Sequence, residues 1–393
     1  MSKPDQDLKF HIKVVINKEK TKVLFAEASA HFTDVLLSFL VLPFSKIMEV
    51  LEKHYGDKAP VIGSLNTLYK GAANLHIDHF LGEYWRENII NSTRFDDELS
   101  CLRLNCGTHP ASSSSWKSYD GVFTDGASSF IITHDLCVFP IVGGSIIDTL
   151  STLGIAMEDM HDIETRNLTF GLKEVIALLK DSLISSNPFT ALIFPERRMI
   201  VATEGHVVLH QIDQMYMFRN SWNLILKVML QKSTNKFLFA QANGEFVNFL
   251  FTMLSISLER VDWYLASNTG LKNMASLIAN DSKIKQLKYN EDLLSKSKGN
   301  QQQAYVLRSG MYIVRDDLTV SPLGLTSGVS LINELKISLS DLKEVKLKVG
   351  LEEGLSILKA ALKSTTALTD GLVNPFLIKQ EMDIKPFLKR EME

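Results

Sequence analysis

An internal duplication constrains the fold of this sequence more than any other feature. Residues 13–51 and 227–265 align without a gap, and 12 of the 39 positions are identical. A second pair of segments, 130–140 and 312–322, shares the pattern Asp-Leu-x-Val-x-Pro. Because segments that recur in the same order indicate recurring structural units, we expect the chain to contain two copies of one unit.

The duplication also predicts where the chain divides. Two further matching segments, residues 171–183 and 350–362, complete each copy. We place the boundary after residue 213, which gives a first half of residues 1–213 and a second half of residues 214–393. A chain of this length holds roughly two or three domains of ordinary size, which agrees with two copies.

The halves differ in the polar inserts that separate their matching segments. The first insert, residues 82–128, contains four consecutive serines, and the second, residues 281–310, contains Lys-Gly-Asn-Gln-Gln-Gln. Polar segments of this kind are typical of surface connections, so we interpret both inserts as loops.

The first repeated segment predicts a β-hairpin followed by a helix. Residues 12–16 and 22–28 are short β-branched and aromatic runs on either side of a polar turn. Apolar residues between Phe32 and Leu40 then recur at i, i+3, i+4, i+7 and i+8, and the second copy keeps this spacing. We therefore expect a helix that is buried on most sides.

A second helix is expected directly after the first. Pro43 is suited to the first turn of a helix because it has no N–H to leave unpaired, and Gly56 is suited to its end. In the second copy the inward positions of this helix correspond to Val261, Tyr264 and Leu265.

The second repeated segment predicts another hairpin and two more helices. Residues 130–139 form two short strands around a tight turn, and Pro140 ends the pairing because proline cannot donate to a ladder. Apolar spacing then predicts helices over residues 147–153 and 172–183. Hairpins with helices on one face describe an α+β fold, here as two homologous halves in a pseudo-twofold arrangement.

Charge and composition exclude several classes of function. Forty-two Lys and Arg against 45 Asp and Glu give a net charge of −3, so no bulk basic field attracts nucleic acid or an anionic membrane. The longest apolar run, residues 35–44, is far shorter than the roughly 18–20 residues that span a bilayer. The N-terminus has no targeting pattern, and three cysteines fit reduced thiols better than a disulfide framework. We expect a cytoplasmic protein that binds neither nucleic acid nor membranes.

The repeated strings resemble those of a known family. Lys-Val-Leu-Phe-Ala-Glu-Ala at residues 22–28, followed by Leu-Pro at 42–43, and Val-Arg-Asp-Asp-Leu-Thr-Val-Ser-Pro at 314–322 are similar to motifs of a plant-specific family known as domain of unknown function 674. The resemblance covers nearly the whole chain, including the tandem arrangement. It implies a plant source and a cytoplasmic location. Because the family carries no agreed activity, the resemblance transfers no catalytic residues.

Asp135 and Asp317 recur at equivalent positions of the two halves. Two carboxylates brought together by pseudo-symmetry would suit general acid-base chemistry. Aspartate in a hairpin turn more commonly bonds its own backbone and tolerates positive φ, and we favour that interpretation for both residues and for Asp316.

Two groups of side chains have spacings that suit metal ligands. Cys101, Cys106 and His109 have a C-x4-C-x2-H spacing, with Cys137 too distant in sequence to assign as a fourth ligand. A structural zinc site normally has four ligands, so we favour an ordinary polar loop.

The second group, His76, His79 and Glu83, is spaced i, i+3 and i+7, near one face of a helix. Such a face suits a catalytic metal site, but a solvated surface helix is the commoner outcome. Neither group has a counterpart in the second half, and we predict no metal.

No motif identifies an enzyme. A P-loop, a dinucleotide fingerprint and a Gly-x-Ser-x-Gly elbow are all missing from the sequence, so we predict no cofactor and leave catalysis open, with no catalytic residue assigned. Since the repeated residues are core and turn residues, we favour a non-catalytic module that binds a protein or a small hydrophobic metabolite, in stress or defence responses. The alternative is an enzyme or metabolite carrier with a pocket between the two halves, where fused lobes commonly form clefts.

Overall fold

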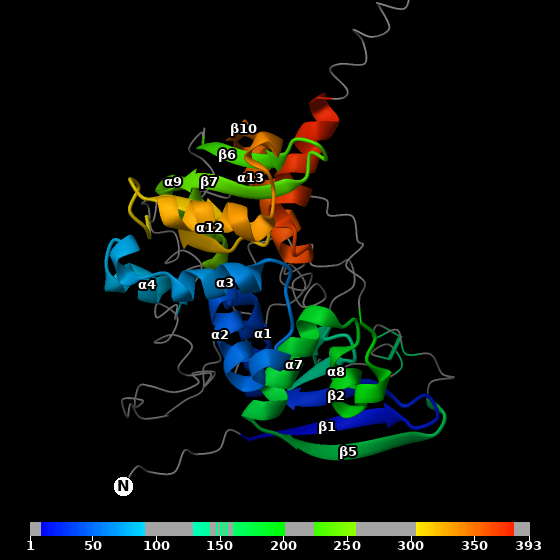
Figure 1. The fold of residues 1–393 in the computed structure, drawn as a ribbon. Coiled ribbons are helices and arrows are strands. Elements are labelled where there is room, and N and C mark those ends of the chain that lie inside the picture. The colour runs from blue at the N-terminus through cyan, green and yellow to red at the C-terminus, as the bar shows by residue number, and fades with distance from the viewer. Residues whose placement is uncertain are drawn as a thin grey trace, which may run out of the picture.

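The computed structural model contains two five-stranded sheets, each packed against helices (Figure 1). The structure describes residues 9–90, 129–141, 160–200, 224–256 and 304–380, together with 147, 150, 151, 153 and 155. The strand pairs within both sheets are antiparallel. Helices combined with antiparallel sheets confirm the predicted α+β class.

The first sheet has the strand order β4-β3-β2-β1-β5. Its strands are β1 (Phe10–Asn17), β2 (Lys22–Ser29), β3 (Ser129–Thr133), β4 (Val138–Pro140) and β5 (Ile163–Phe170). The helices of this part of the chain are α1 (Ala30–Val41), α2 (Phe44–Tyr55), α3 (Leu65–Asn74), α4 (Glu83–Ile90), α7 (Leu172–Ile184) and α8 (Pro188–Ile193), with the 3-10 turns η1 (Gly56–Lys58), η2 (Ile77–His79) and η6 (Pro195–Arg197).

The second sheet has the order β10-β6-β7-β8-β9, which repeats the first sheet when its strands are matched by the duplication. Its strands are β6 (Leu224–Gln231), β7 (Phe237–Asn243), β8 (Met311–Val314), β9 (Val320–Pro322) and β10 (Leu342–Val349). The helices are α9 (Gly244–Leu254), α12 (Leu325–Leu335), α13 (Leu351–Lys363) and a helix over residues 367–380 whose Thr369–Val373 turn, η12, is π-type, with the 3-10 turn η11 (Leu339–Asp341).

The predicted hairpins are confirmed in both copies, down to an irregularity in their pairing. The register of β1 with β2 shifts between Val15 and Ile16, and that of β6 with β7 shifts between Met229 and Leu230. These positions are aligned in the duplication. A β-bulge bends the strand that carries it, so both sheets bend at the same place.

The helices expected after the first hairpin are also confirmed. Every apolar residue of the predicted stripe in α1, from Phe32 to Leu40, is buried, and α9 buries the matching residues. Ser29 and Asn243 cap the two helices by accepting the N–H groups of Phe32 and Phe246. α2 ends before Gly56 (φ 56°), as expected, but it begins at Phe44, so Pro43 is its N-cap residue and does not lie in its first turn. Its counterpart at 261–265 lies outside the described residues.

The sequence analysis missed one strand in each half. β5 and β10 pair along eight residues with β1 and β6 and form an edge of each sheet, where only helices were expected. The outward residues of an edge strand are polar, which hid the strand pattern in β5. In β10 the signal was present, because Val345, Leu347 and Val349 alternate with charged residues.

The inserts are not loops throughout. α4 occupies the start of the first insert, and Tyr305 and Val306 near the end of the second are buried. Val306, in the second insert, forms a β-bridge with Phe80, which lies just before the first insert. The buried apolar side chains explain why these parts are ordered against the core. The remainder of the inserts, residues 91–128 and 281–303, lies outside the described residues.

Of the helix expected over residues 147–153, the structure describes residues 147, 150 and 151, which are helical, and residue 153, which lies in a turn. Its counterpart α12 is confirmed and packs on the face of the second sheet opposite the main core. There Leu331 joins Met229, Phe239 and Ile313 in a small separate cluster. None of the helices within the described residues combines the length and apolar character that crossing a bilayer requires.

Residues 62–81 of the first half lie against the second half, with α3 at the level where the halves meet (Figure 1). Ser64 donates its backbone N–H to the carbonyl of Ala361 (2.8 Å) and its hydroxyl to the carbonyl of Ser364 (2.6 Å). A Cβ added at Gly71 of α3 would lie 3.1 Å from the backbone nitrogen of Val320 in β9. One hydrophobic core contains residues from both sheets, so the described part of this junction is closely packed.

Replacing Gly71 with valine tests the contact between α3 and β9. The two methyl groups have no room beside Val320, so we expect Gly71→Val to lower the free energy of unfolding by about 1–3 kcal/mol, as overpacking does. Gly328 in α12 is the matched control, because it is also helical and a Cβ there meets no atom within 4 Å. Denaturant unfolding that gives equal stabilities for Gly71→Val and Gly328→Val would contradict this junction.

Candidate functional site

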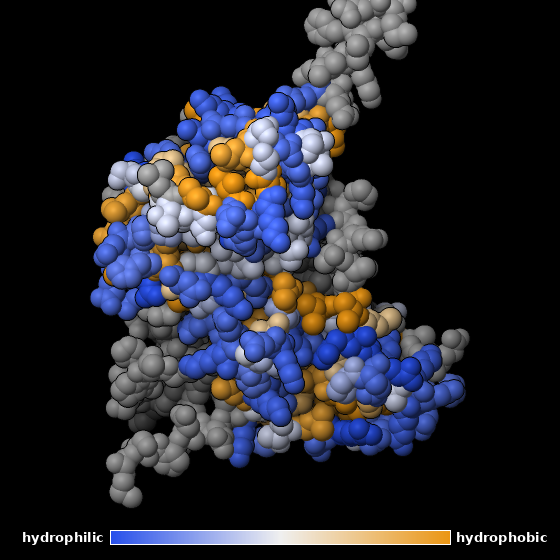
Figure 2. Space-filling model, in the orientation of Figure 1, coloured by the Kyte–Doolittle hydropathy of each residue, from blue (hydrophilic) through white to orange (hydrophobic). Residues whose placement is uncertain are grey.

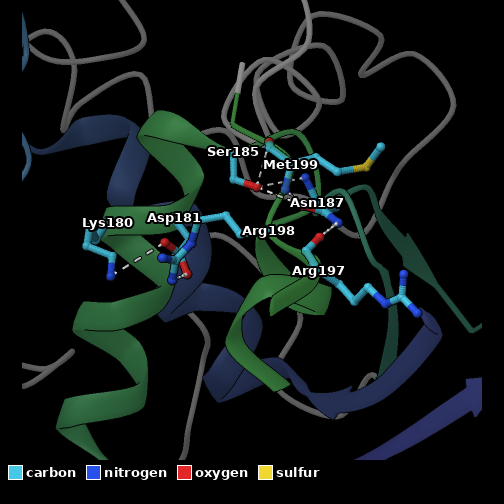
Figure 3. A network of polar contacts seen from close by, with 7 residues as sticks. All are labelled: Lys180, Asp181, Ser185, Asn187, Arg197, Arg198 and Met199. Carbon is cyan, nitrogen blue, oxygen red and sulfur yellow. Dashed lines mark hydrogen bonds and ion pairs between the residues drawn. The ribbon is translucent and has the colours of Figure 1, made fainter. Parts of the chain in front are cut away.

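A polar network with a buried carboxylate lies where α7 ends, in the loop to α8 and in the residues after η6 (Figure 3). It belongs to the first half and brings together groups from three consecutive elements. Its members are Lys180, Asp181, Ser185, Asn187, Arg197, Arg198 and Met199.

Asp181 is the centre of the network. The apolar face of α7 packs into the core, and Asp181 lies among these buried positions with 1% of its surface exposed. Nη2 of Arg198 lies 3.0 Å from Oδ2 of Asp181, and Nζ of Lys180 lies 3.6 Å from Oδ1. A buried carboxylate is costly unless it is paired, so these cations are what keeps Asp181 in the core.

The cations outnumber the carboxylate, and an aromatic ring covers one of them. The ammonium group of Lys180 lies 4.8 Å from the ring centroid of Tyr55, within the range of a cation–π contact. Burial raises the pKa of the Tyr55 hydroxyl, and Asp181 raises it further, whereas Arg198 lowers it. Tyr55 is therefore neutral at physiological pH and offers the network an aromatic face rather than a base.

The ion pair leaves two buried polar atoms without a hydrogen bond among the described residues, Oδ1 of Asp181 and Nε of Arg198. Oδ1 is compensated by the charge of Lys180, although the 3.6 Å separation is too long for a good hydrogen bond. Asp181 is thus held by one charge-assisted hydrogen bond from Arg198 and by the charge of Lys180, so its burial depends on both cations.

A second part of the network fixes the chain after η6 to the α7–α8 loop. The amide oxygen of Asn187 accepts the N–H of Met199 (2.9 Å), and its amide nitrogen donates to the carbonyl of Arg197 (2.9 Å). The hydroxyl of Ser185 lies 2.8 Å from the same Asn187 oxygen and 3.1 Å from the carbonyl of Met199. Ser185 also forms a β-bridge with Ile200. The backbone of residues 197–200 is thus held by several part-buried hydrogen bonds.

Two apolar side chains that this backbone carries are exposed. Met199 is 62% exposed and Ile200 is 74% exposed, and Figure 3 shows the Met199 side chain directed away from the network. The arrangement therefore holds two apolar side chains in solvent on this backbone, with the exposed Arg197 beside them. Chemically it can contact an apolar group and a nearby anionic one.

The second half lacks the carboxylate at the centre of this network, although Lys359 aligns with Lys180. Asp181 aligns with Ala360. The serine is kept, since Ser364 stands at the position of Ser185, but its hydroxyl lies 2.7 Å from that of Thr366 instead of an asparagine. The sequence analysis did not single out Asp181. The alanine at the aligned position of the other copy, on the buried face of the helix, was the signal that would have found it.

The structure places Asp135 and Asp317 in the tight turns of β3–β4 and β8–β9, one in each sheet. Asp135 accepts a hydrogen bond from the hydroxyl of Thr133, and Oδ1 of Asp317 accepts the N–H of Thr319 at 3.0 Å. Positive φ belongs to the next residues instead, Leu136 (65°) and Leu318 (63°). Both leucines are fully buried, so burial holds a conformation that leucine rarely adopts.

Asp316 has a role that its turn position did not indicate. Its carboxylate accepts the N–H and the hydroxyl of Thr369, at 2.7 and 2.6 Å, at the start of the helix over residues 367–380. Burial raises the pKa of Asp316, while these bonds from Thr369 lower it. Asp316 therefore ties the turn of the second sheet to this helix.

The helix expected to carry His76, His79 and Glu83 does not form. His76 precedes η2, His79 ends it, and Glu83 begins α4 after the extended Phe80, so the three do not share one helical face. Among the described residues no group of three or more His, Cys, Asp or Glu is placed to hold a metal ion. The other predicted group, Cys101, Cys106 and His109, lies outside them.

Cys137 lies in the β3–β4 hairpin and is half-buried. Burial, with a further contribution from Asp135, raises the pKa of its thiol to about 11. Because the thiolate is the reactive form, Cys137 is not an activated nucleophile at physiological pH.

Comparison with protein families gives one match, to a model described as Protein of unknown function (DUF674). It matches residues 6–105, 100–299, 271–352 and 300–392. Neither the curated proteins nor the solved structures contain a match.

Breaking the Asp181 ion pair tests its contribution to stability. Arg198→Met leaves Asp181 buried with only the more distant Lys180, and we expect a loss of about 3 kcal/mol, the low end for a broken buried pair because Arg198 is 28% exposed. Arg315→Met is the matched control, since Arg315 and Glu334 also lie 3.0 Å apart but are exposed. Adding Asp181→Ala to Arg198→Met should restore part of the loss, and denaturant unfolding that shows independent effects would contradict the pairing.

Asp316 predicts a pH dependence of stability in the acidic range. Because its pKa is raised in the folded state, the folded protein holds this proton more tightly than the unfolded chain does. Stability should therefore fall as the pH rises from the ordinary pKa of aspartate through the raised one. Asp316→Asn should remove this fall, which unfolding curves of both proteins across that range would measure. An unchanged slope in Asp316→Asn would show that another group is responsible.

Proposed function

Because the chain belongs to the family described as Protein of unknown function (DUF674), whose model matches it repeatedly between residues 6 and 392, its function must come from its own site, and we propose that it is a non-catalytic protein-binding module. The segment Arg197–Ile200 is the proposed contact. The observation that carries the proposal is an exposed apolar pair, Met199 and Ile200, on a backbone held by part-buried hydrogen bonds to the nearly buried Asn187.

The energetics of binding support this use of the segment. Association costs less when the contacting residues are already held in place, because less conformational entropy is lost. Exposed apolar side chains beside arginine are typical of the centres of protein interfaces. Figure 2 shows apolar atoms gathered on the viewed face beside the C-terminal end of α7, in the part of the first half that carries this loop.

The groups near the segment support binding better than catalysis. Tyr55 is held neutral by its raised pKa, and the Asp181 carboxylate is occupied by two cations. Each of these contacts fixes position, and none of them prepares a nucleophile or a base. Cys137 likewise has a raised pKa.

The alternative, a pocket between the halves for an enzyme or metabolite carrier, gains no support from the described part of the junction. There Ser64 bonds directly to the backbone of the second half, and glycine allows α3 to approach β9. We therefore retain the protein-binding function.

The setting we propose is the cytoplasm of plant cells, with a part in stress or defence responses. The resemblance to the family supports the plant setting, and the charge of −3 agrees with a partner other than nucleic acid.

Site-specific crosslinking tests the proposed contact. A photoreactive side chain placed at position 199 should crosslink a partner protein in plant cell extract, because Met199 is exposed on the proposed surface. An excess of the unlabelled protein should compete with this crosslink, whereas an excess of the double variant Met199→Asp/Ile200→Asp should not. The crosslinked partner is identified by mass spectrometry.

Position 225 provides the control, because Ile225 is also 62% exposed but lies on the second sheet. The variant Ile225→Asp should compete as well as the unchanged protein. If Met199→Asp/Ile200→Asp competes equally well, or if positions 199 and 225 crosslink the same proteins, the segment is not the contact.

A further inference from the structure

The two sheets have four edges, and three of them are protected against pairing with another strand. β4 and β9 contain three residues each and end in proline, which cannot donate to a ladder. β10 is longer but carries Lys343, Lys346 and Lys348 against a single Glu344. Lysines on an edge strand oppose pairing because two such strands repel each other.

β5 is the edge without these features. It contains eight residues, without proline, lysine or glycine, and pairs with β1 in an unbroken register. Within the described part of the chain, β1 is the one strand that pairs with it. In Figure 1, β5 forms the border of the first sheet on the side away from the second half. The side of β5 that faces away from β1 therefore presents backbone N–H and C=O groups along a regular strand.

The side chains of β5 are suited to contact with a strand rather than with water alone. Thr165, Asn167 and Thr169 share its outward face with Ile163, which is 42% exposed. Threonine and isoleucine are among the residues that pack best across paired strands. The one acid and one base of the strand, Glu164 and Arg166, form a bidentate pair at 2.8 and 3.1 Å, so β5 carries no net charge.

The order of these charges is complementary to itself. When two β5 strands run antiparallel with Thr165 of each at the centre, Glu164 of one copy stands opposite Arg166 of the other, twice. Shifting the centre by one residue either way places two arginines or two glutamates opposite each other. The charges therefore favour one register, in which the two sheets join with their helices on the same side.

From the open edge and its charge pattern we propose that β5 is a dimerisation strand. A second copy of this chain pairs with it antiparallel about a twofold axis at Thr165, which makes one continuous ten-stranded sheet. The two copies use the same surface, as in most symmetric dimers. One strand pair is a small interface, so the dimer dissociates on dilution.

The oligomeric state of the purified chain is the first test. Sedimentation velocity over a range of concentrations should show monomers that convert to dimers. Glu164→Arg places four arginines at the axis and Arg166→Glu places four glutamates there, so each variant alone should remain a monomer. An equimolar mixture of the two variants restores opposite charges across the axis and should form the dimer again, which also shows that both variants are folded.

The control exchanges the same charges elsewhere. Arg315 and Glu334 form a comparable bidentate pair on the second half, at 3.3 and 3.0 Å. Glu334→Arg and Arg315→Glu should leave the dimer unchanged, because that pair lies away from the proposed axis.

A disulfide test reports the register directly. Thr165→Cys places two thiols opposite each other and should give a disulfide-linked dimer under mild oxidation. Asn167→Cys separates the thiols by about four residues of strand, roughly 13 Å, beyond the reach of a disulfide. The unchanged protein gives the baseline for its own cysteines. The proposal is overturned if the chain stays monomeric at all concentrations, as it would if β5 paired with a strand from a different protein. It is also overturned if the mixture of charge variants fails to associate, or if both cysteine variants give the same yield of disulfide-linked dimer.

Discussion

The central helices α1 and α9 are apolar on nearly every side, and the rest of the structure depends on enclosing them. A helix of this kind cannot be covered by one sheet alone, because a sheet contacts one face of it. In this chain α2 and α3 of the first half approach α9, and the N–H of Phe44 bonds to the carbonyl of Ile256 (3.1 Å). The two halves are therefore joined by the need to bury their own central helices, which explains why one hydrophobic core contains residues from both.

The elements that the sequence predicted are those with an uninterrupted apolar pattern. The hairpins, α1, α2 and α7 show their periodicity on residues that are almost all buried. β5 was missed because five of its eight residues are polar. α3 was missed because the role of its small residues, such as Gly71, depends on the β9 backbone that they approach. The duplication predicted the second sheet from the first. It carried no information on how the two meet, since contacts between copies are not themselves repeated.

The candidate site followed the opposite pattern. Residues that the sequence predicted as candidate site residues by their type, such as His76 and Asp135, stabilise local turns instead. Asp181, which lies at the centre of the network, is on the buried face of an amphipathic helix and belongs to no motif. The role of Asp181 depends on its ion pair with Arg198, and the tertiary structure sets the position of Arg198 after η6. In the second half Ala360 stands in its place. The two copies have therefore diverged at this position, and the ion pair is found in the first half.

The way residues 62–81 lie on the second half has a consequence for the order of synthesis. This segment leaves the ribosome long before its partners Val320 and Ala361 exist. During that interval the first half can form its own sheet, but the apolar side of α3, including Leu65 and Leu68, has no surface of the second half to cover it. Such exposed apolar surface is what chaperones recognise in partly made proteins. The native junction thus sets a minimum length of chain that must be translated before the first half can complete its packing.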